Sequence, residues 1–203
     1  MSSKSLLDAV LSDIAFLAPS GYYIGLHIRF TSPLITMNTY PPEWVRQYTQ
    51  SGFALRDPVV AWGFGDAGPS RWSEITIPDT FGIMAQAATH GLKYGVVVPA
   101  GELNSRTIGS VARSDREFSD VEIELISHHI KHLHELTQPP RRLTRSQSEA
   151  LRLVAEGDRY NVAAKKLGIS ESALKARLST ARDRLSARTT AEAVQRAIDY
   201  GLL

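Results

Sequence analysis

Residues 161–185 constrain the fold of this chain most, because they specify two short helices joined by a tight turn. Apolar side chains recur there at i, i+4, i+7 and i+11, the spacing of one stripe along an α-helix: Leu174, Leu178, Ala181 and Leu185. Ser170 precedes this helix and is a favoured N-cap residue. Gly168 ends the preceding helical segment, residues 162–167, because glycine adopts the left-handed C′ conformation without strain. The pattern predicts a helix-turn-helix, in which the second helix enters the major groove of DNA.

The face of the second helix opposite Leu174 is polar and basic. A rotation of 100° per residue places five residues there, and two arginines, Arg177 and Arg184, at its flank. The five are Ser172, Lys175, Ala176, Ser179 and Arg182. Cations can bind phosphates, whereas short or forked polar side chains on the exposed face can reach base edges. An ordinary solvated basic face is the alternative. The coincidence of turn, caps and charge favours DNA binding.

Two further helices complete a module of four. Thr144 and Gln147 have the spacing of a capping box, which starts a helix that Gly157 ends. Its inward residues are predicted to be Leu151, Val154 and Ala155. Thr189 and Glu192 predict a second capping box before a last helix over residues 190–200. A module this small must pack each helix on the others to hold a core.

This four-helix module resembles the LuxR-type DNA-binding domain. The resemblance covers the whole module, in LTRSQSEALRLVAEGDRYNVAAKKLGISESALKARLSTARDRL and TTAEAVQRAIDYGLL. Gln147 stands where the family usually has Glu, so the helix N-terminus lacks one charge and we expect a small loss of stability. Arg159 stands where a capping Ser or Thr is usual, which weakens that helix start. The resemblance implies homodimers that read a dyad-symmetric operator in double-stranded DNA, with the helix over residues 190–200 as one subunit contact.

Charge is divided unevenly along the 203 residues. The total is +2, but residues 141–203 hold thirteen Lys and Arg against seven Asp and Glu, or +6, which leaves −4 for the remainder. This asymmetry assigns contact with nucleic acid to the C-terminal part. The chain has no cysteine, which excludes disulfides and fits a cytoplasmic protein. We expect no membrane association, because no apolar run is long enough to span a bilayer and residues 1–17 lack a signal-peptide pattern.

The N-terminal part is predicted to be α+β, an α-β-α sandwich around a small, mostly antiparallel sheet. Apolar periodicity predicts helices over residues 6–17, 43–52, 59–62, 79–90 and 120–136. Strands are predicted over residues 23–30, 34–38, 94–99 and 107–112. In the first strand one face would carry Ile24, Leu26, Ile28 and Phe30.

The boundary between the two parts is predicted at the sequence TQPPRR. Pro139 and Pro140 cannot continue a helix and leave a stiff, extended link. The predicted domains are a sensor over residues 1–136, a linker over residues 137–142 and an all-α, four-helix helix-turn-helix domain over residues 143–203.

Aromatic residues with polar tips gather in the N-terminal part. Tyr40, Trp44 and Tyr48 are four residues apart, so they share one side of a helix and its lead-in. Asp57 and Trp72 follow at turns, and small residues occupy the later strands: Gly95, Gly109 and Ser110. Buried indole, phenol and carboxylate groups must satisfy one another or a ligand. They would suit a small molecule with an amide and a carbonyl ring. The alternative, favoured by composition alone, is an aromatic core in which Asp57 caps the following helix.

A second resemblance favours a ligand site over an aromatic core. The segments NTYPPEWVRQY, LRDPVVAW, RWSEI, HGLKYGVVVP and IGSVARS are similar to the autoinducer-binding domain of LuxR quorum-sensing regulators. The resemblance implies a buried N-acyl-homoserine lactone, with Trp44 donating to the lactone carbonyl, Asp57 accepting the amide N–H and Tyr40 donating to the amide carbonyl. It also implies that Tyr48 and Trp72 line the lactone and acyl chain. The remaining implied contacts are the Ser110 hydroxyl near the amide and close packing at Gly95.

These features predict a transcriptional regulator whose operator binding is controlled by an acyl-homoserine lactone, with RNA polymerase as a possible further partner and no cofactor. One alternative is a solo regulator that senses another small molecule or none. Another is a repressor that binds DNA when empty and is released by ligand. An enzyme such as a lactone hydrolase is disfavoured, because the sequence offers no nucleophile–His–acid set. The histidines at 128, 129, 132 and 134 fit a surface or interface better than a metal site.

Overall fold

The computed structural model describes residues 3–29, 32–139, 142–185 and 187–203. The chain divides into two compact units, Met1–Gln138 and Pro139–Leu203. The first is a mixed helix and antiparallel-sheet unit, as the sequence predicted, and the second is helical within the described residues.

The described part of the first unit is built on a five-stranded sheet in the order β2-β1-β5-β4-β3. Its strands are β1 (Gly21–Ile28), β2 (Ile35–Asn38), β3 (Ser70–Arg71), β4 (Tyr94–Ala100) and β5 (Arg106–Arg113). Every neighbouring pair is antiparallel. The central strands β4 and β5 are almost entirely buried, in keeping with their apolar runs.

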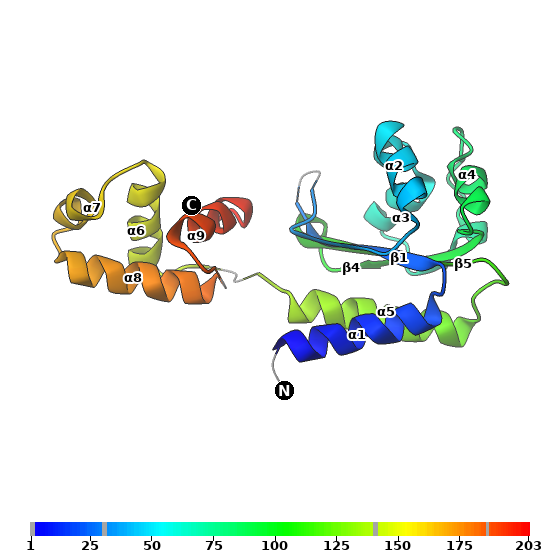
Figure 1. The fold of residues 1–203 in the computed structure, drawn as a ribbon, viewed down its shortest axis with the longest axis horizontal. Coiled ribbons are helices and arrows are strands. Elements are labelled where there is room, and N and C mark those ends of the chain that lie inside the picture. Colours follow the sequence, from blue (N-terminus) through cyan, green and yellow to red (C-terminus); the bar gives the residue numbers. More distant parts are fainter. Residues whose placement is uncertain (1–2, 30–31, 140–141, 186) are drawn as a thin grey trace. The chain divides into compact units, whose positions relative to one another are not determined.

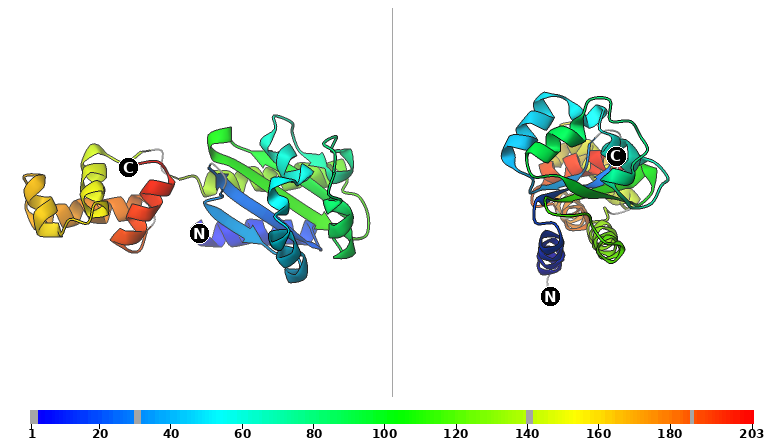
Figure 2. Two further views of the ribbon diagram at one scale, coloured as in Figure 1. Left: turned by 90° about the horizontal axis from the view of Figure 1, so that it is seen from above. Right: turned by 90° about the vertical axis from the view of Figure 1, so that its right-hand side faces the viewer.

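Helices cover both faces of this sheet (Figure 1). One face carries α1 (Ser3–Leu17) and α5 (Asp120–Leu136), which pack against each other and are seen end-on in Figure 2. The other face carries α2 (Pro42–Gln50), α3 (Pro58–Phe64) and α4 (Ile83–Thr89). Three 3₁₀ turns, η1 (Phe53–Leu55), η2 (Trp72–Glu74) and η3 (Leu103–Ser105), link these elements. The sheet therefore separates two apolar cores.

A β-bulge in β1 corrects one sequence prediction. Ile24 and Leu26 lie in the core beneath α1 and α5, as their alternation indicated. Ile28 lies in the opposite core, because the register with β5 shifts by one residue between Gly25 and Ile28. His27, within the bulge, has φ of 52°, and among the described residues it is the only non-glycine residue with positive φ. An extra residue reverses every later side chain of a strand, which simple alternation cannot anticipate.

The start of α4 is a second correction. The sequence predicted a helix from Asp79, but α4 begins at Ile83, after Gly82 with φ of 61°. Asp79 acts from outside the helix, where its two carboxylate oxygens accept the backbone N–H groups of Ile83 and Met84, each at 2.8 Å. The predicted helix began too many residues upstream, because an acidic residue that caps a helix and one in its first turn look alike in sequence.

The described residues of the second unit form α6 (Arg145–Ala155), α7 (Tyr160–Lys166), α8 (Glu171–Arg184) and α9 (Thr190–Asp199). The α8 stripe is buried as predicted, and residues from all four helices share its core. Ser170 caps α8 by accepting the Ala173 N–H at 3.2 Å, and Gly168 has φ of 66° in the preceding turn. Ala155, predicted to face inward, is exposed.

The two capping boxes differ. Thr144 and Gln147 bond reciprocally, and Gln147 Nε2 also donates to Thr180 Oγ on α8 at 3.1 Å. At α9 the Thr189 hydroxyl accepts the Glu192 N–H at 3.1 Å. The Glu192 carboxylate returns to the N–H of Arg188 instead, so the second box is only half formed.

Two predicted positions, Phe30 and Pro140, lie outside the described residues. Within the described ranges, no helix has both the length and the apolar character needed to cross a bilayer. The same residues hold no group of three or more metal-ligating side chains.

Candidate functional site

Trp44 is the centre of an aromatic cluster on the face of the sheet covered by α2, α3 and α4. It is buried, and its ring lies 5.6 Å from that of Tyr48 in an edge-to-face arrangement. Phe53 and His90 complete the cluster, with ring centroids 6.2 and 5.6 Å from Trp44. The cluster depends on α2, whose N-terminal proline positions fix the helix start so that residues 44 and 48 face the sheet.

Asp57 is bonded through both of its oxygens. Oδ1 accepts the Val59 N–H at 2.7 Å and caps α3, while Oδ2 accepts the Tyr48 hydroxyl at 2.7 Å. Burial raises the pKa of Asp57, and the bonds from Tyr48 and Val59 oppose that rise. Burial together with the Asp57 charge also raises the pKa of Tyr48, so the phenol remains the donor. Asp57 therefore caps its helix and also presents a buried acceptor to the aromatic cluster.

Tyr40 joins the lead-in of α2 to the central strand β5. Its hydroxyl donates to the Ser110 carbonyl at 2.9 Å and lies 3.1 Å from Ser110 Oγ. Burial raises the pKa of Tyr40, which keeps the phenol protonated. Two predicted ligand residues that are 70 positions apart in sequence are thus in direct contact.

Trp72 lies flat over Gly95 of β4. A Cβ atom on Gly95 would lie 2.2 Å from two atoms of the indole ring, so only glycine permits this contact. Trp72 is 8% exposed, and its Nε1 is buried without a hydrogen-bond partner among the described residues. A buried, unpaired indole N–H is costly, and a ligand acceptor would remove that cost.

The predicted ligand residues therefore gather on one face of the sheet, and sequence reasoning missed several of their neighbours. Phe53 and His90 pack against Trp44 from η1 and the end of α4. His90 Nε2 lies 3.0 Å from Gln47 Oε1, and Gln47 Nε2 donates to Gln86 Oε1 at 2.8 Å, which links α2 to α4. These pairs join elements that are distant in sequence, so no local pattern could have indicated them.

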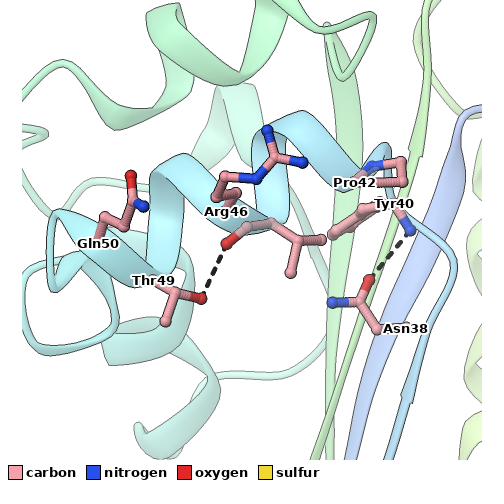
Figure 3. A pocket seen from close by; sticks show the side chains of 7 residues that line it. Asn38, Tyr40, Pro42, Arg46, Thr49 and Gln50 are labelled. Carbon is pink, nitrogen blue, oxygen red and sulfur yellow. Dashed lines mark hydrogen bonds between the residues drawn. The ribbon is translucent and has the colours of Figure 1, made fainter.

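A groove of about 580 Å³ runs along the outer side of α2 (Figure 3). Of the predicted ligand residues only Tyr40 lines it; the others are Asn38, Pro42, Val45, Arg46, Thr49 and Gln50. Asn38 Oδ1 accepts the Tyr40 N–H at 3.0 Å and fixes the turn into α2. The groove is therefore a neighbour of the aromatic cluster and distinct from it.

The second candidate surface is the polar face of α8. Ser172, Lys175 and Ala176 are exposed, while Arg177, Ser179 and Arg182 are half-buried. Lys175 pairs with Glu171 at 2.7 Å, one turn earlier on the same helix. Arg182 Nη2 lies 3.4 Å from Ser179 Oγ, and its Nε has no partner among the described residues. The exposed members lie in the first half of α8.

The four histidines of α5 fall into two places: the rings of His128, His129 and His132 lie together, and His134 lies apart from them. His128 and His132 stack in parallel, with ring centroids 6.3 Å apart, and His128 is exposed. His134 instead contacts His27 of β1, with ring centroids 4.4 Å apart.

The family model described as the autoinducer binding domain matches residues 21–138. The transcriptional activator VanR of Vibrio anguillarum is 28% identical over 189 residues, covering 85% of this chain and 79% of its own. The transcriptional activator RaiR of Rhizobium etli is 29% identical over 181 residues, covering 80% and 74%. Among solved structures, SdiA in complex with octanoyl-rac-glycerol has a TM-score of 0.54 at 20% identity, over 98% of this chain and 88% of SdiA.

Proposed function

Because this chain belongs to the LuxR family of quorum-sensing transcriptional regulators, we propose that a lactone bound by its first unit controls operator binding by its second. Its relatives are transcriptional activators, so the chain is a regulator and no enzyme. The proposed ligand is an N-acyl-homoserine lactone, and the proposed operator is a dyad-symmetric site read by a homodimer in the cytoplasm.

The observation that carries the ligand proposal is the set of polar groups around the aromatic cluster. Asp57 offers a buried acceptor, Tyr40 a buried hydroxyl and Trp72 an unpaired N–H. An N-acyl-homoserine lactone carries one amide N–H, which would pair with Asp57, and two carbonyl groups, which would accept from indole N–H groups or from the Tyr40 hydroxyl once it leaves the Ser110 carbonyl. Tyr48 supplies an apolar wall, and Trp44, which the resemblance implies as the donor to the lactone carbonyl, lies in the same core as Trp72.

Ligand binding would act through mass action. A lactone that contacts only the folded sensor adds apolar contact and supplies an acceptor for a buried donor. At a concentration of 100 times its Kd, this stabilises the folded unit by about 2.7 kcal/mol.

The DNA proposal rests on α8 and on charge. Ser172, Lys175 and Ala176 are exposed on the helix that follows the turn at Gly168. Residues 141–203 carry a net +6, which favours contact with phosphates. We expect Arg177, Ser179 and Arg182 to contribute from the flank of the same face, α9 to form one dimer contact and RNA polymerase to be recruited by the bound dimer.

A second ligand class is favoured by one comparison. SdiA, which shares this fold, was solved with octanoyl-rac-glycerol, an acyl chain with a hydroxyl head group. A solo regulator with such a ligand would use the same apolar walls and a different set of polar contacts.

One experiment separates these ligands. Protein produced with a mixture of N-butanoyl-, N-octanoyl- and N-dodecanoyl-homoserine lactones and octanoyl-glycerol is analysed by native mass spectrometry. Our proposal predicts that a homoserine lactone is retained, and gel shifts with and without it give the sign of the DNA response. Retention of octanoyl-glycerol alone would support the second class, and retention of none would contradict ligand control.

A further inference from the structure

A buried polar cluster, which we call the His27 cluster, lies where β1, η3, β5 and the end of α5 meet. Its members are His27, Ser105, Thr107, His134 and Thr137. His27 is fully buried and is held through three contacts: its backbone N–H donates to Thr107 Oγ at 3.2 Å, Nδ1 lies 2.9 Å from Ser105 Oγ, and Nε2 lies 3.1 Å from Thr137 Oγ. Thr107 Oγ also lies 2.8 Å from His134 Nδ1.

The hydroxyl of Thr137 determines the tautomer of His27. Thr137 Oγ donates its only proton to the Leu133 carbonyl at 2.6 Å, so it can only accept from His27. Nε2 of His27 therefore carries a proton and donates it to Thr137. In the neutral ring Nδ1 is then the acceptor for the Ser105 hydroxyl. The imidazole thus connects β1 to Thr137, the C-cap residue of α5, by a directional bond.

The bulge places this connection directly beside a residue that faces the opposite side of the sheet. His27 faces α5, whereas the next residue, Ile28, lies in the apolar core that contains Trp44 and Trp72. Because His27 and Ile28 are adjacent, a single peptide bond connects the sheet face of the proposed ligand site to the C-terminus of α5. His27 maintains positive φ without being glycine, a conformation that persists only where surrounding contacts impose it. The C-terminal ends of β1 and α5 meet at this cluster. Both therefore lie close to Pro139, where the second unit begins.

From this geometry we infer that His27 is a positioning residue, which transmits ligand occupancy from Ile28 to Thr137 and so to the segment that leads into the DNA-binding unit. The inference rests on the proposed function, because it needs a ligand on the Ile28 side and a DNA response. It assigns no contact with ligand or DNA to His27 itself.

The test compares hydroxyl variants in the full-length chain. Thr137→Val removes the acceptor for His27 and retains the side-chain shape, and Thr137→Ser restores the hydroxyl. Thr49→Val is the matched control, because Thr49 donates the same kind of bond to the carbonyl four residues earlier, at 2.8 Å, and no histidine of the described ranges bonds to it. His27→Asn is a second variant, because asparagine tolerates positive φ but is too short to replace the imidazole.

Three quantities are measured for each variant: affinity for N-octanoyl-homoserine lactone by calorimetry, the midpoint of urea unfolding, and affinity for a dyad-symmetric duplex selected in vitro, with and without lactone. The ratio of the two DNA affinities measures the coupling. We expect Thr137→Val and His27→Asn to reduce this ratio by about fivefold or more, with lactone affinity within about twofold of the wild type. Thr137→Ser and Thr49→Val should retain the wild-type ratio.

Two results would overturn the inference while leaving the proposed function intact. One is an unchanged ratio in both Thr137→Val and His27→Asn. The other is a parallel loss of lactone affinity, stability and ratio in both, since that pattern describes a purely structural bond. A wild-type protein that binds lactone but has the same DNA affinity with and without it would overturn the proposed function and the inference together.

Discussion

At the scale of single residues, Asp57 shows how one carboxylate that caps a helix leaves an oxygen for the proposed ligand. Its Oδ1 caps α3 and its Oδ2 accepts from Tyr48. The two interpretations that the sequence left open, a helix cap and a ligand acceptor, are therefore compatible. Because the cap needs only one oxygen, the roles can be separated by mutation.

Asp57→Asn should abolish the response to lactone and leave the fold intact. Asparagine keeps an oxygen for the Val59 N–H and is as good an N-cap as aspartate. It replaces the other oxygen by an NH₂ group, which donates hydrogen bonds and so cannot accept the amide N–H of the ligand. Urea unfolding within about 1 kcal/mol of the wild type, together with loss of lactone binding by calorimetry, would agree with the assignment. A variant that still responds at unchanged lactone concentrations would show that the pocket is assigned wrongly.

Gly95→Val should displace Trp72 and weaken both stability and lactone binding. A Cβ atom at Gly95 would come within 2.2 Å of the indole, so the ring must move. Overpacking of this kind costs about 1–3 kcal/mol of unfolding free energy. The matched control is Gly68→Val, because a Cβ atom at Gly68 would have no neighbour within 4 Å in the part of the chain that the structure describes. Equal unfolding midpoints for the two variants would contradict the proposed packing.

At the scale of elements, the helices were the most predictable and the sheet edges the least. The α8 stripe and the Ser170 cap follow from spacing within one helix, so the sequence alone located them. The two-residue strand β3 was missed because it has too few residues to show alternation. The bulge at His27 depends on contacts with Thr107 and Thr137, which are 80 and 110 positions away in sequence.

The candidate site, like the fold, was predictable from the sequence only in part. Residues four apart on α2 could be assigned to one face, and the structure brings Trp44 and Tyr48 into contact. The partner of each polar group could not be predicted, because Tyr40 meets Ser110 through two strand pairings, β1 with β2 and β1 with β5. The unpaired N–H of Trp72 likewise depends on its packing over Gly95.

For α8, Lys175→Ala should weaken operator binding. Lys175 is exposed and pairs with Glu171, a surface ion pair of small energy that DNA can replace. Loss of one phosphate contact should lower the slope of log affinity against log salt concentration by about 1. The control is Lys131→Ala, which removes the same charge from an exposed position on α5. Fluorescence anisotropy over a salt series measures both, and identical slopes for the two variants would remove Lys175 from the interface.

The His27 cluster also predicts a pH dependence of stability. Burial, and then the proximity of His134, lower the pKa of His27 from 6.5 to about 4, and Arg29 contributes in the same direction. The unfolded chain therefore binds a proton at a higher pH than the folded chain, so the free energy of unfolding falls as the pH falls from 6.5 toward 4. The loss should be on the order of 1–3 kcal/mol.

Urea unfolding of the wild type and of His27→Asn between pH 7.5 and 4.5 measures this effect as a difference. The difference is needed because burial raises the pKa of Asp57, which changes the free energy of unfolding with pH in the opposite sense. The variant should show the shallower dependence on pH. Parallel profiles would mean that His27 does not remain neutral in the folded state.

At the scale of the whole molecule, the division of charge matches the proposed division of labour. Residues 141–203 carry +6 and the remainder −4, so we expect the attraction to DNA to come from the second unit. The first unit contributes a cluster of aromatic and polar groups on one face of its sheet. The account requires that occupancy of the first unit change the affinity of the second, in either direction.

The most direct measurement is therefore the affinity of the full-length protein for a dyad-symmetric duplex, selected in vitro, with and without the lactone that it retains. We predict that saturating lactone changes this affinity by about fivefold or more, because allosteric coupling is typically 1–3 kcal/mol. The Asp57→Asn protein should show one affinity under both conditions. Wild-type protein that binds the lactone and holds the duplex with the same affinity in its presence and absence would contradict the account.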